Sequence, residues 1–240
     1  RGLQRRGALH PIDLTLRRGE VTGLAGLLGS GRTETARLLF GIDRADGGEI
    51  KIKDQRAHLD SPREAVRLGL AFCSEDRKTE GILPNLSVRE NLICALQAKR
   101  GAWRTLARSE QEKICAHYIT ALRIKTPDAE TPIKNLSGGN QQKVILAKWL
   151  ATAPKILLLD EPTRGIDVNA KREIYAFIDE LACNGLGLIV VSSELPEVLA
   201  LSDRIMVMCE GRKTAEFTRA EATPERVLHA ALPDRAAIAC

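Results

Sequence analysis

The sequence predicts an α/β fold into which a helical subdomain is inserted. Continuous apolar runs at 70–73, 156–159 and 188–191 are typical of strands covered on both faces. An amphipathic helix predicted at 171–183 separates the last two runs, as in a parallel strand–helix–strand unit. Residues 86–131 have helical periodicity instead, without strand signals. With 240 residues, 44% of them hydrophobic, the chain can bury a full core.

The remaining elements follow from turn and capping signals. Residues 61–64 read Ser-Pro-Arg-Glu, a capping box with proline just inside the helix, so a helix is expected from Ser61 to near Gly69. Short strands are predicted within 1–53, including one at the alternating Leu14 and Leu16 and one at 49–53. A break in the helical segment is predicted at Gly101. Near the end of the chain, the pattern predicts a hairpin at 205–208 before Gly211 and a helix with a frayed end at 222–240.

Composition narrows the function classes. No apolar stretch approaches the roughly 18–20 residues that span a bilayer. The six scattered cysteines contain no C-x-x-C pair, which indicates reduced core thiols rather than disulfides or a metal site. The net charge of +5 is compatible with anionic partners, but aromatic residues are only 3%, so no nucleic-acid partner is expected. Because the chain opens at Arg1 without a methionine, we expect a fragment of a longer polypeptide.

Residues 26–33 read Gly-Leu-Leu-Gly-Ser-Gly-Arg-Thr and fit a G-x-x-x-x-G-K-[ST] phosphate loop at all but one position. A strand at 20–25 precedes the loop, and a helix is expected from Thr33 onward. In that setting backbone N–H groups cradle phosphates and the Thr33 hydroxyl can reach Mg²⁺. Arg32 replaces the lysine, and a forked guanidinium does not occupy the space of a compact ammonium. The predicted nucleotide contacts are Gly26, Gly29, Ser30, Gly31, Arg32, Thr33 and Glu34.

Two further motifs carry charge-stabilising chemistry. Asp160 ends the strand at 156–159, where a Mg²⁺-coordinating carboxylate belongs, and Glu161 is the candidate base that polarises the attacking water. Residues 136–142 read Leu-Ser-Gly-Gly-Asn-Gln-Gln, and Ser137 with two glycines at a helix start makes a second anion-binding terminus. Two such cradles suit two subunits that close over shared nucleotides.

Together these motifs resemble those of ABC-transporter ATPase domains over essentially the whole chain. Residues 26–33 are similar to a Walker A motif and 156–161 to a Walker B motif. Residues 136–142 are similar to the ABC signature motif, and Asp167 is similar to the D-loop aspartate. The resemblance implies that Ser137, Gly138, Gly139 and Gln141 face a partner's ATP. More narrowly, four segments resemble the second, C-terminal ATPase domain of the tandem ATPases of bacterial monosaccharide importers (ribose, galactose, xylose and relatives): 31–34, 74–78, 140–143 and 161–165.

The resemblance implies a P-loop NTPase fold, with a RecA-like core and an antiparallel β subdomain at 1–85 and 132–221, an ABC helical subdomain at 86–131, and a C-terminal helix and tail at 222–240. It also implies ATP and Mg²⁺ as ligands. The implied partners are an N-terminal ATPase domain of the same polypeptide, in a head-to-tail dimer, and transmembrane permease subunits contacted through 76–88, with a periplasmic sugar-binding protein acting indirectly. The implied location is peripheral, on the cytoplasmic face of the bacterial inner membrane.

Three positions depart from an active ATPase of this family. Arg32 replaces the Walker A lysine, Glu75 stands at the Q-loop glutamine, and Ser193 stands at the switch histidine. All three belong to the domain's own site, and no aromatic residue is assigned to adenine stacking. Each lost charge-stabilising group typically lowers hydrolysis by a factor of about 10²–10³. We therefore expect weak or absent hydrolysis at this site, with the signature motif completing the partner domain's site.

Two alternatives stay open at this point. The first is a regulatory module that binds ATP without hydrolysing it, which the losses at Arg32 and Ser193 support. The second is a soluble ABC ATPase that acts on nucleic acid or the ribosome, for which the basic pI of about 9.0 is the only support.

Overall fold

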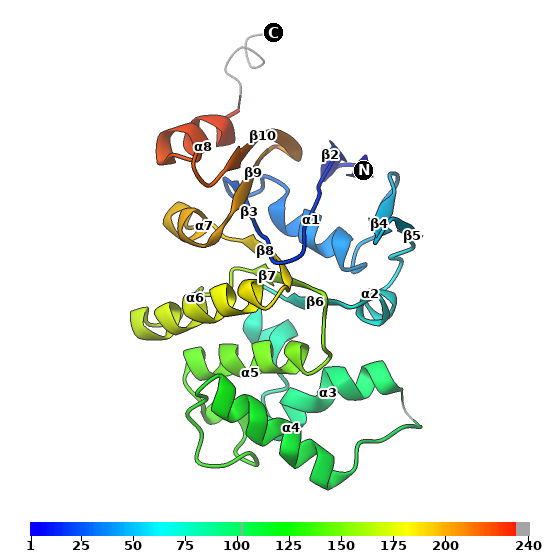
Figure 1. Cartoon of the computed structure of the whole chain (residues 1–240), viewed down its shortest axis with the longest axis vertical. Coiled ribbons are helices and arrows are strands. Elements are labelled where there is room, and N and C mark those ends of the chain that lie inside the picture. Colours follow the sequence, from blue (N-terminus) through cyan, green and yellow to red (C-terminus); the bar gives the residue numbers. More distant parts are fainter. Residues whose placement is uncertain (102, 234–240) are drawn as a thin grey trace.

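A computed structural model describes residues 1–101 and 103–233 (Figure 1). The strands are β1 (Leu3–Arg5), β2 (Leu9–Ile12), β3 (Val21–Gly26), β4 (Ile50–Ile52), β5 (Gln55–Ala57), β6 (Leu70–Cys73), β7 (Ile156–Asp160), β8 (Gly187–Val191), β9 (Arg204–Cys209) and β10 (Arg212–Thr218). The helices are α1 (Arg32–Leu39), α2 (Pro62–Leu68), α3 (Val88–Arg100), α4 (Arg108–Ala121), α5 (Gly138–Leu150), α6 (Val168–Cys183), α7 (Leu195–Leu201) and α8 (Pro224–Ala231), with short turns η1 (Arg77–Gly81) and η2 (Ile133–Asn135).

A six-stranded sheet forms the centre of the molecule, in the order β10-β9-β3-β8-β7-β6. Strands β9, β3, β8, β7 and β6 are parallel to their neighbours, and only the β9–β10 pair is antiparallel. Strand β8 lies between β3 and β7, so Val191 is paired with both Leu24 and Asp160. This register brings the carboxyl ends of β3, β8 and β7 to one edge, where ligands bind in open α/β sheets.

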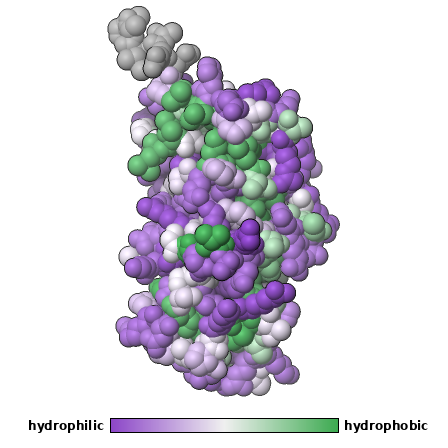
Figure 2. Space-filling model, turned by 90° about the vertical axis from the view of Figure 1, so that its left-hand side faces the viewer, coloured by the Kyte–Doolittle hydropathy of each residue, from purple (hydrophilic) through white to green (hydrophobic). Residues whose placement is uncertain are grey.

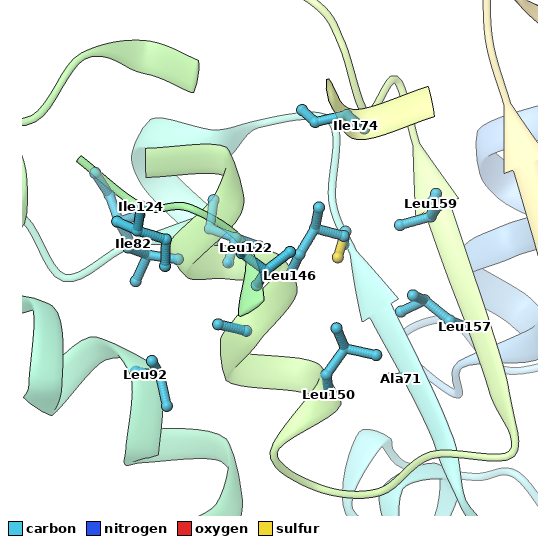
Figure 3. Close-up of a cluster of buried hydrophobic side chains, with 14 of the residues drawn as sticks. Ala71, Ile82, Leu92, Leu122, Ile124, Leu146, Leu150, Leu157, Leu159 and Ile174 are labelled. Atoms are coloured by element: carbon cyan, nitrogen blue, oxygen red, sulfur yellow. The ribbon is translucent and has the colours of Figure 1, made fainter. Parts of the chain in front are cut away.

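The core fills both faces of this sheet. Along β7, Leu157 and Leu159 pack on the side of α5, where Leu146 and Leu150 meet them (Figure 3). Leu158 points to the opposite face and packs among the residues of α1 and the N-terminal strands. Because successive strand residues face opposite sides, burial on both faces requires the unbroken apolar run seen in the sequence.

Helices α3, α4 and α5 group at one end of the molecule, with α8 and the N-terminus near the other (Figure 1). Helix α3 begins with a capping box in which Ser87 and Glu90 satisfy each other's backbone amides, and it ends before Gly101. Buried Leu92 of α3 joins the same core cluster as the sheet residues. Helices α3 and α5 therefore pack together over this part of the sheet. Their packing determines the position of the first turn of α5, which carries residues of the candidate site.

Most predicted elements are confirmed. The helix from Ser61 to Gly69, the break at Gly101 and the terminal hairpin are all present. The prediction of a strand at Leu14 and Leu16 is wrong, since both side chains pack against the core without a pairing partner. Helix α6 begins at Val168 rather than at 171. Of the helix and frayed end predicted at 222–240, α8 forms, and 234–240 lie outside the described residues.

The surface is largely polar. Within the described residues, no helix combines the length and the apolar character needed to cross a bilayer. Figure 2 shows mostly hydrophilic side chains on one face, with apolar side chains gathered near its upper end. Helix α8 lies at that end, and Leu228 within it and Leu232 directly after it are each half exposed.

Candidate functional site

The phosphate loop connects β3 to α1 through three glycines with positive φ. Gly26, Gly29 and Gly31 have φ values of 155°, 76° and 100°, which side chains with a Cβ rarely adopt. At Gly26 a Cβ would also lie 2.5 Å from the Ser30 hydroxyl, so the loop is closed tightly on itself. The loop ends at Gly31, directly before the first turn of α1, which is the geometry of an anion cradle.

Arg32 does not extend freely from this cradle. Its side chain is buried, with 6% exposed, and its Nη1 donates a hydrogen bond to the carbonyl oxygen of Ser192. Burial lowers the pKa of Arg32, while the nearby carboxylates of Glu161 and Asp160 oppose that shift. The guanidinium therefore bridges α1 to the end of β8.

Thr33 and Asp160 face each other across the edge of the sheet. The Thr33 hydroxyl lies 3.4 Å from Oδ1 of Asp160, while Oδ2 is buried without a hydrogen-bond partner among the described residues. Burial raises the pKa of Asp160 to about 7. A buried carboxylate oxygen with no donor is what a divalent cation would satisfy, so these residues fit Mg²⁺ held by one carboxylate, one hydroxyl and substrate phosphates.

Glu161 is held by the residue at the switch position. The Ser193 amide lies 2.6 Å from Oε1 of Glu161, and the Ser193 hydroxyl lies 3.1 Å from Oε2. Burial raises the pKa of Glu161, and these two hydrogen bonds partly offset the increase. The backbone of Glu161 has a φ of 48°, which is strained for a residue with a side chain.

A buried hydrogen-bond network that the sequence did not predict supports this arrangement. Glu197 is 1% exposed and accepts hydrogen bonds from the hydroxyls of Thr163 and Ser192. Ser192 thus links Arg32 through its carbonyl and Glu197 through its hydroxyl. No local pattern separates Glu197 from the exposed Glu194, since only the packing of α7 on the sheet buries one of them.

A cleft of about 510 Å³ opens beside Thr33, Asp160 and Glu161. Glu75 lines it and forms an ion pair with Arg164, which follows the β7 end. This pair joins the segment after β6 to the loop before α6. Arg32 and Ser193 do not line the cleft themselves: Ser193 is bonded to Glu161, which does, whereas Arg32 is bonded to Ser192, which does not.

A second cavity, of about 750 Å³, lies on the other side of the phosphate loop. Gly29 and Glu34 border it, together with residues 4–11 of the N-terminal hairpin. Its side chains include Arg5, Arg6 and His10, and among the residues that the structure describes no aromatic ring other than this histidine lines it.

Ser137, Gly138, Gly139 and Gln141 lie outside the lining of that cleft, at the first turn of α5, whereas Gln142 of the same motif lines it. Ser137 is exposed and caps the helix, with its hydroxyl 3.5 Å from the Asn140 amide. Gly139 packs so closely on α6 that a Cβ would lie 2.6 Å from the Ala170 Cβ and 3.8 Å from Oδ2 of Asp167. Gln141 turns inward instead and donates to the carbonyl of Leu136 at 3.1 Å. Ser137 is therefore the exposed residue of the Ser-Gly-Gly edge, Gly138 is half-buried, and Gly139 is buried against α6 next to the D-loop position.

Asp167 has a local structural role. Its carboxylate accepts hydrogen bonds from the amides of Asn169 and Ala170, at 3.0 and 2.9 Å, and so caps α6. Backbone hydrogen bonding, first of all from Ala170, lowers the pKa of Asp167. This cap explains why α6 begins earlier than expected.

Comparison with known proteins gives consistent matches. Residues 9–164 match the family model described as ABC transporter. The galactofuranose transporter ATP-binding protein YtfR of Escherichia coli strain K12 is 51% identical over 226 residues, which cover 94% of this chain and 45% of that protein. The ribose import ATP-binding protein RbsA of Rhodopirellula baltica is 49% identical over 233 residues, covering 97% and 46%. The chain thus spans about half the length of these curated relatives.

Solved structures match the fold. The ATP-binding cassette MJ1267 has a TM-score of 0.81 at 22% identity, covering 96% of both chains. The dimeric bacterial ABC transporter cassette MJ0796 has a TM-score of 0.76 at 24% identity, covering 88% of this chain and 90% of that one. At these identities the likeness concerns the fold alone, an α/β P-loop NTPase cassette.

Proposed function

The chain belongs to the ABC transporter family, and on that premise we propose that it is the ATP-binding domain of a monosaccharide importer with a degenerate site of its own. Curated relatives are named for the transport or import of galactofuranose, ribose and arabinose. In this proposal the domain binds ATP and hydrolyses it weakly. Its signature motif completes the ATP site of a partner ATPase domain, which lies in the same polypeptide.

The observation that carries the proposal is the contrast between two groups of residues. At the domain's own loop, Arg32 is bonded to the Ser192 carbonyl and Ser193 occupies both oxygens of Glu161. At the signature, Ser137 is exposed and its neighbour Gly138 is half-exposed, so this helix start is accessible to a ligand held by a partner domain. A group committed to a neighbouring carbonyl gives less stabilisation to a developing phosphate charge.

The residues would divide the work as follows. Backbone amides of 26–33 bind the phosphates, and Thr33 with Asp160 would hold Mg²⁺, which supplies charge neutralisation when bound. Glu161 would orient water, but its carboxylate is already occupied by Ser193. The expected result at this site is retention of nucleotide with little turnover.

The segment 76–88 is proposed to contact transmembrane permease subunits, on the cytoplasmic face of the bacterial inner membrane. Leu83 and Leu86 expose 48% and 39% of their surface there, beside charged Arg77 and Lys78. The buried Asn91 fixes this segment to α3 by accepting from the Leu83 amide at 2.7 Å and donating to three carbonyl oxygens. A loop fixed this firmly presents a defined surface to a partner.

The proposal is tested by comparing two serine caps. Ser137→Ala and Ser61→Ala each remove a helix N-cap, a change that typically costs about 1 kcal/mol. In the whole ATPase polypeptide purified with its membrane subunits, Ser137→Ala is expected to abolish most ATP turnover, whereas Ser61→Ala leaves it near the parent value. Equal activities for the two variants would refute the role of the signature motif.

A second candidate function is a purely regulatory module, and the bond between Arg32 and Ser192 favours it as well. Single-turnover hydrolysis in the whole polypeptide separates the two. Hydrolysis at the partner site supports the importer ATPase, and nucleotide binding without any hydrolysis supports the regulatory module.

A further inference from the structure

The turn η1 lies along the signature helix α5 and touches it at both ends. It is separated from β6 by residues 74–76 and precedes the segment 82–87, which leads into α3. Three contacts fasten the turn to α5: one near the helix C-terminus, one in the middle and one at the N-terminus. The contacts at the two ends each use a basic side chain.

Lys148 makes the contact near the C-terminus of α5. Its side chain is buried, with 8% exposed, and Nζ donates to the carbonyl oxygen of Gly81 at 2.6 Å. No carboxylate of the described residues forms an ion pair with it, and burial lowers its pKa. Nζ also lies 5.3 Å from the centroid of the Trp149 ring, and Lys148 stands in the last turn of α5, where the helix dipole favours a cation. The buried ammonium thus ties the C-terminal end of α5 to the carbonyl of the turn.

Gly81 makes the contact in the middle. It is buried, and a Cβ at this position would lie 2.8 Å from Cδ1 of Ile145 on α5. The backbone of the turn therefore rests directly on the Ile145 side chain, and a residue larger than glycine at 81 would push the turn away from the helix.

Arg77 makes the contact at the N-terminus. Its Nη2 lies 3.1 Å from the position that a Cβ of Gly138 would occupy, and the Gly165 carbonyl lies 3.4 Å from the same position. Its Nε is buried without a hydrogen-bond partner among the described residues, and burial lowers the pKa of Arg77. A cation next to a helix N-terminus is repelled by the helix dipole, so this contact does not serve the stability of α5.

We propose that Lys148 and Arg77 are positioning residues that fasten the turn Asp76–Gly81 to both ends of α5, so that a displacement of the turn moves the signature residues. The inference rests on the proposed function for its purpose, because that function places a permease on 76–88 and a partner's ATP on Ser137. The mechanical link itself involves only contacts within this chain. A rigid helix held at both ends transmits a shift without bending.

The test measures hydrogen exchange and glycine amide resonances of the 240-residue chain, without nucleotide or permease. Lys148→Met removes the bond to Gly81 while keeping the apolar stem of the side chain. Lys99→Met is the matched control, because Lys99 Nζ also donates to a carbonyl at 2.6 Å, that of Thr152, but does not touch the turn. Arg77→Gln releases the other end from a half-buried position, and therefore remains informative if Lys148→Met does not fold.

In both test variants the amides of Asn140 and Gln141, which bond to Ser137, are expected to exchange about tenfold faster, and the Gly138 and Gly139 resonances to shift. The control variant leaves these signals in place. Unchanged signals in Lys148→Met and Arg77→Gln, or equal changes in Lys99→Met, would overturn the proposal. Because no ligand is present, this outcome is independent of whether the domain energises import.

Discussion

Ser193 engages both carboxylate oxygens of Glu161, with its amide 2.6 Å from Oε1 and its hydroxyl 3.1 Å from Oε2. In an active member of the family, an imidazole at this position contacts the γ-phosphate instead, as the sequence resemblance implies. The serine has no group that reaches so far. Its bonds to Glu161 also leave the candidate base fewer free lone pairs with which to orient water.

Restoring the compact ammonium at 32 and the imidazole at 193 is expected to restore hydrolysis. We predict that Arg32→Lys with Ser193→His raises single-turnover ATP hydrolysis by a factor of about 10² or more, because each charge-stabilising group contributes that order of effect. The rate is measured as the release of radiolabelled phosphate from ATP, after subtraction of the release in a sample without enzyme. The same double variant with Glu161→Gln serves as the control, and hydrolysis persisting there would exclude Glu161 as the base.

The close contact between α5 and α6 limits what residue 139 can be. Gly139→Ala would place a Cβ 2.6 Å from the Ala170 Cβ, and we predict a loss of about 1–3 kcal/mol in unfolding free energy from overpacking. Urea unfolding measures the loss. Adding Ala170→Gly removes the clash, so the double variant should be more stable than Gly139→Ala; a double variant that is less stable would show that the clash is not the cause.

Acid is expected to weaken the link between the N-terminal segment and the sheet. Arg204 donates to both oxygens of buried Glu20, at 2.9 and 3.0 Å. Burial alone raises the pKa of Glu20, but the hydrogen bond from Arg204 and that from the Arg17 amide outweigh burial, and the pKa lies below its ordinary value of 4.5. A depressed folded-state pKa stabilises the protein above about pH 4.5, and this stability is lost as the pH falls below that value.

Glu20→Gln tests the pair. We predict a loss of about 2 kcal/mol at neutral pH, since Arg204 loses the charged partner of two hydrogen bonds and keeps only Glu216 as its counter-charge. Below pH 4.5 the parent protein should lose stability faster than the variant does, as followed by urea unfolding at several pH values. Parallel curves for the two proteins would contradict the assignment to Glu20.

The cysteines are expected to differ widely in reactivity. Burial raises the pKa of Cys73 to about 12 and that of Cys115 to about 11, whereas Cys183 is exposed. Because the thiolate is the reactive species, we predict that iodoacetamide at pH 8 modifies Cys183 and spares Cys73 and Cys115 in the folded chain. Peptide mass spectrometry reads out each site, and alkylation in urea provides the fully reactive control. Rapid labelling of Cys73 in the folded chain would contradict its burial.

Local signals in the sequence predicted local structure well. The helix between Ser61 and Gly69 follows from its cap and its terminal glycine, which act within a few residues. The alternation at Leu14 and Leu16 led to a wrong prediction of a strand. Alternation shows that one face of a segment is buried, but it does not show that the segment pairs with a neighbouring strand. Helix α6 begins earlier than predicted because Asp167, interpreted from the resemblance as a D-loop residue, also caps it.

The site was predictable where a motif is continuous. Strand ends at a shared edge bring Thr33, Asp160 and Glu161 together, as the motif spacing implied. Their functional roles stay predictions. Two other links were not predictable. The hydrogen bond between Ser192 and Glu197, five positions apart, depends on how α7 packs on the sheet. The ion pair between Glu75 and Arg164, 89 positions apart, depends on how two loops meet, and no local sequence pattern records either arrangement.

Strand β8 ends between the two halves of the site, and its last residues serve both. Ser192 is bonded to Arg32 on one side, Ser193 to Glu161 on the other, and Val191 accepts the amide of Glu161 at 2.9 Å. Arginine and serine therefore form a matched set: a lysine at 32 would release the Ser192 carbonyl, and a histidine at 193 would release Glu161. The Ser192 carbonyl and the Ser193 amide belong to one peptide group, so Arg32 and Glu161 hold that group by its two polar ends, and a substitution at 32 or 193 is expected to change the support that the other position receives.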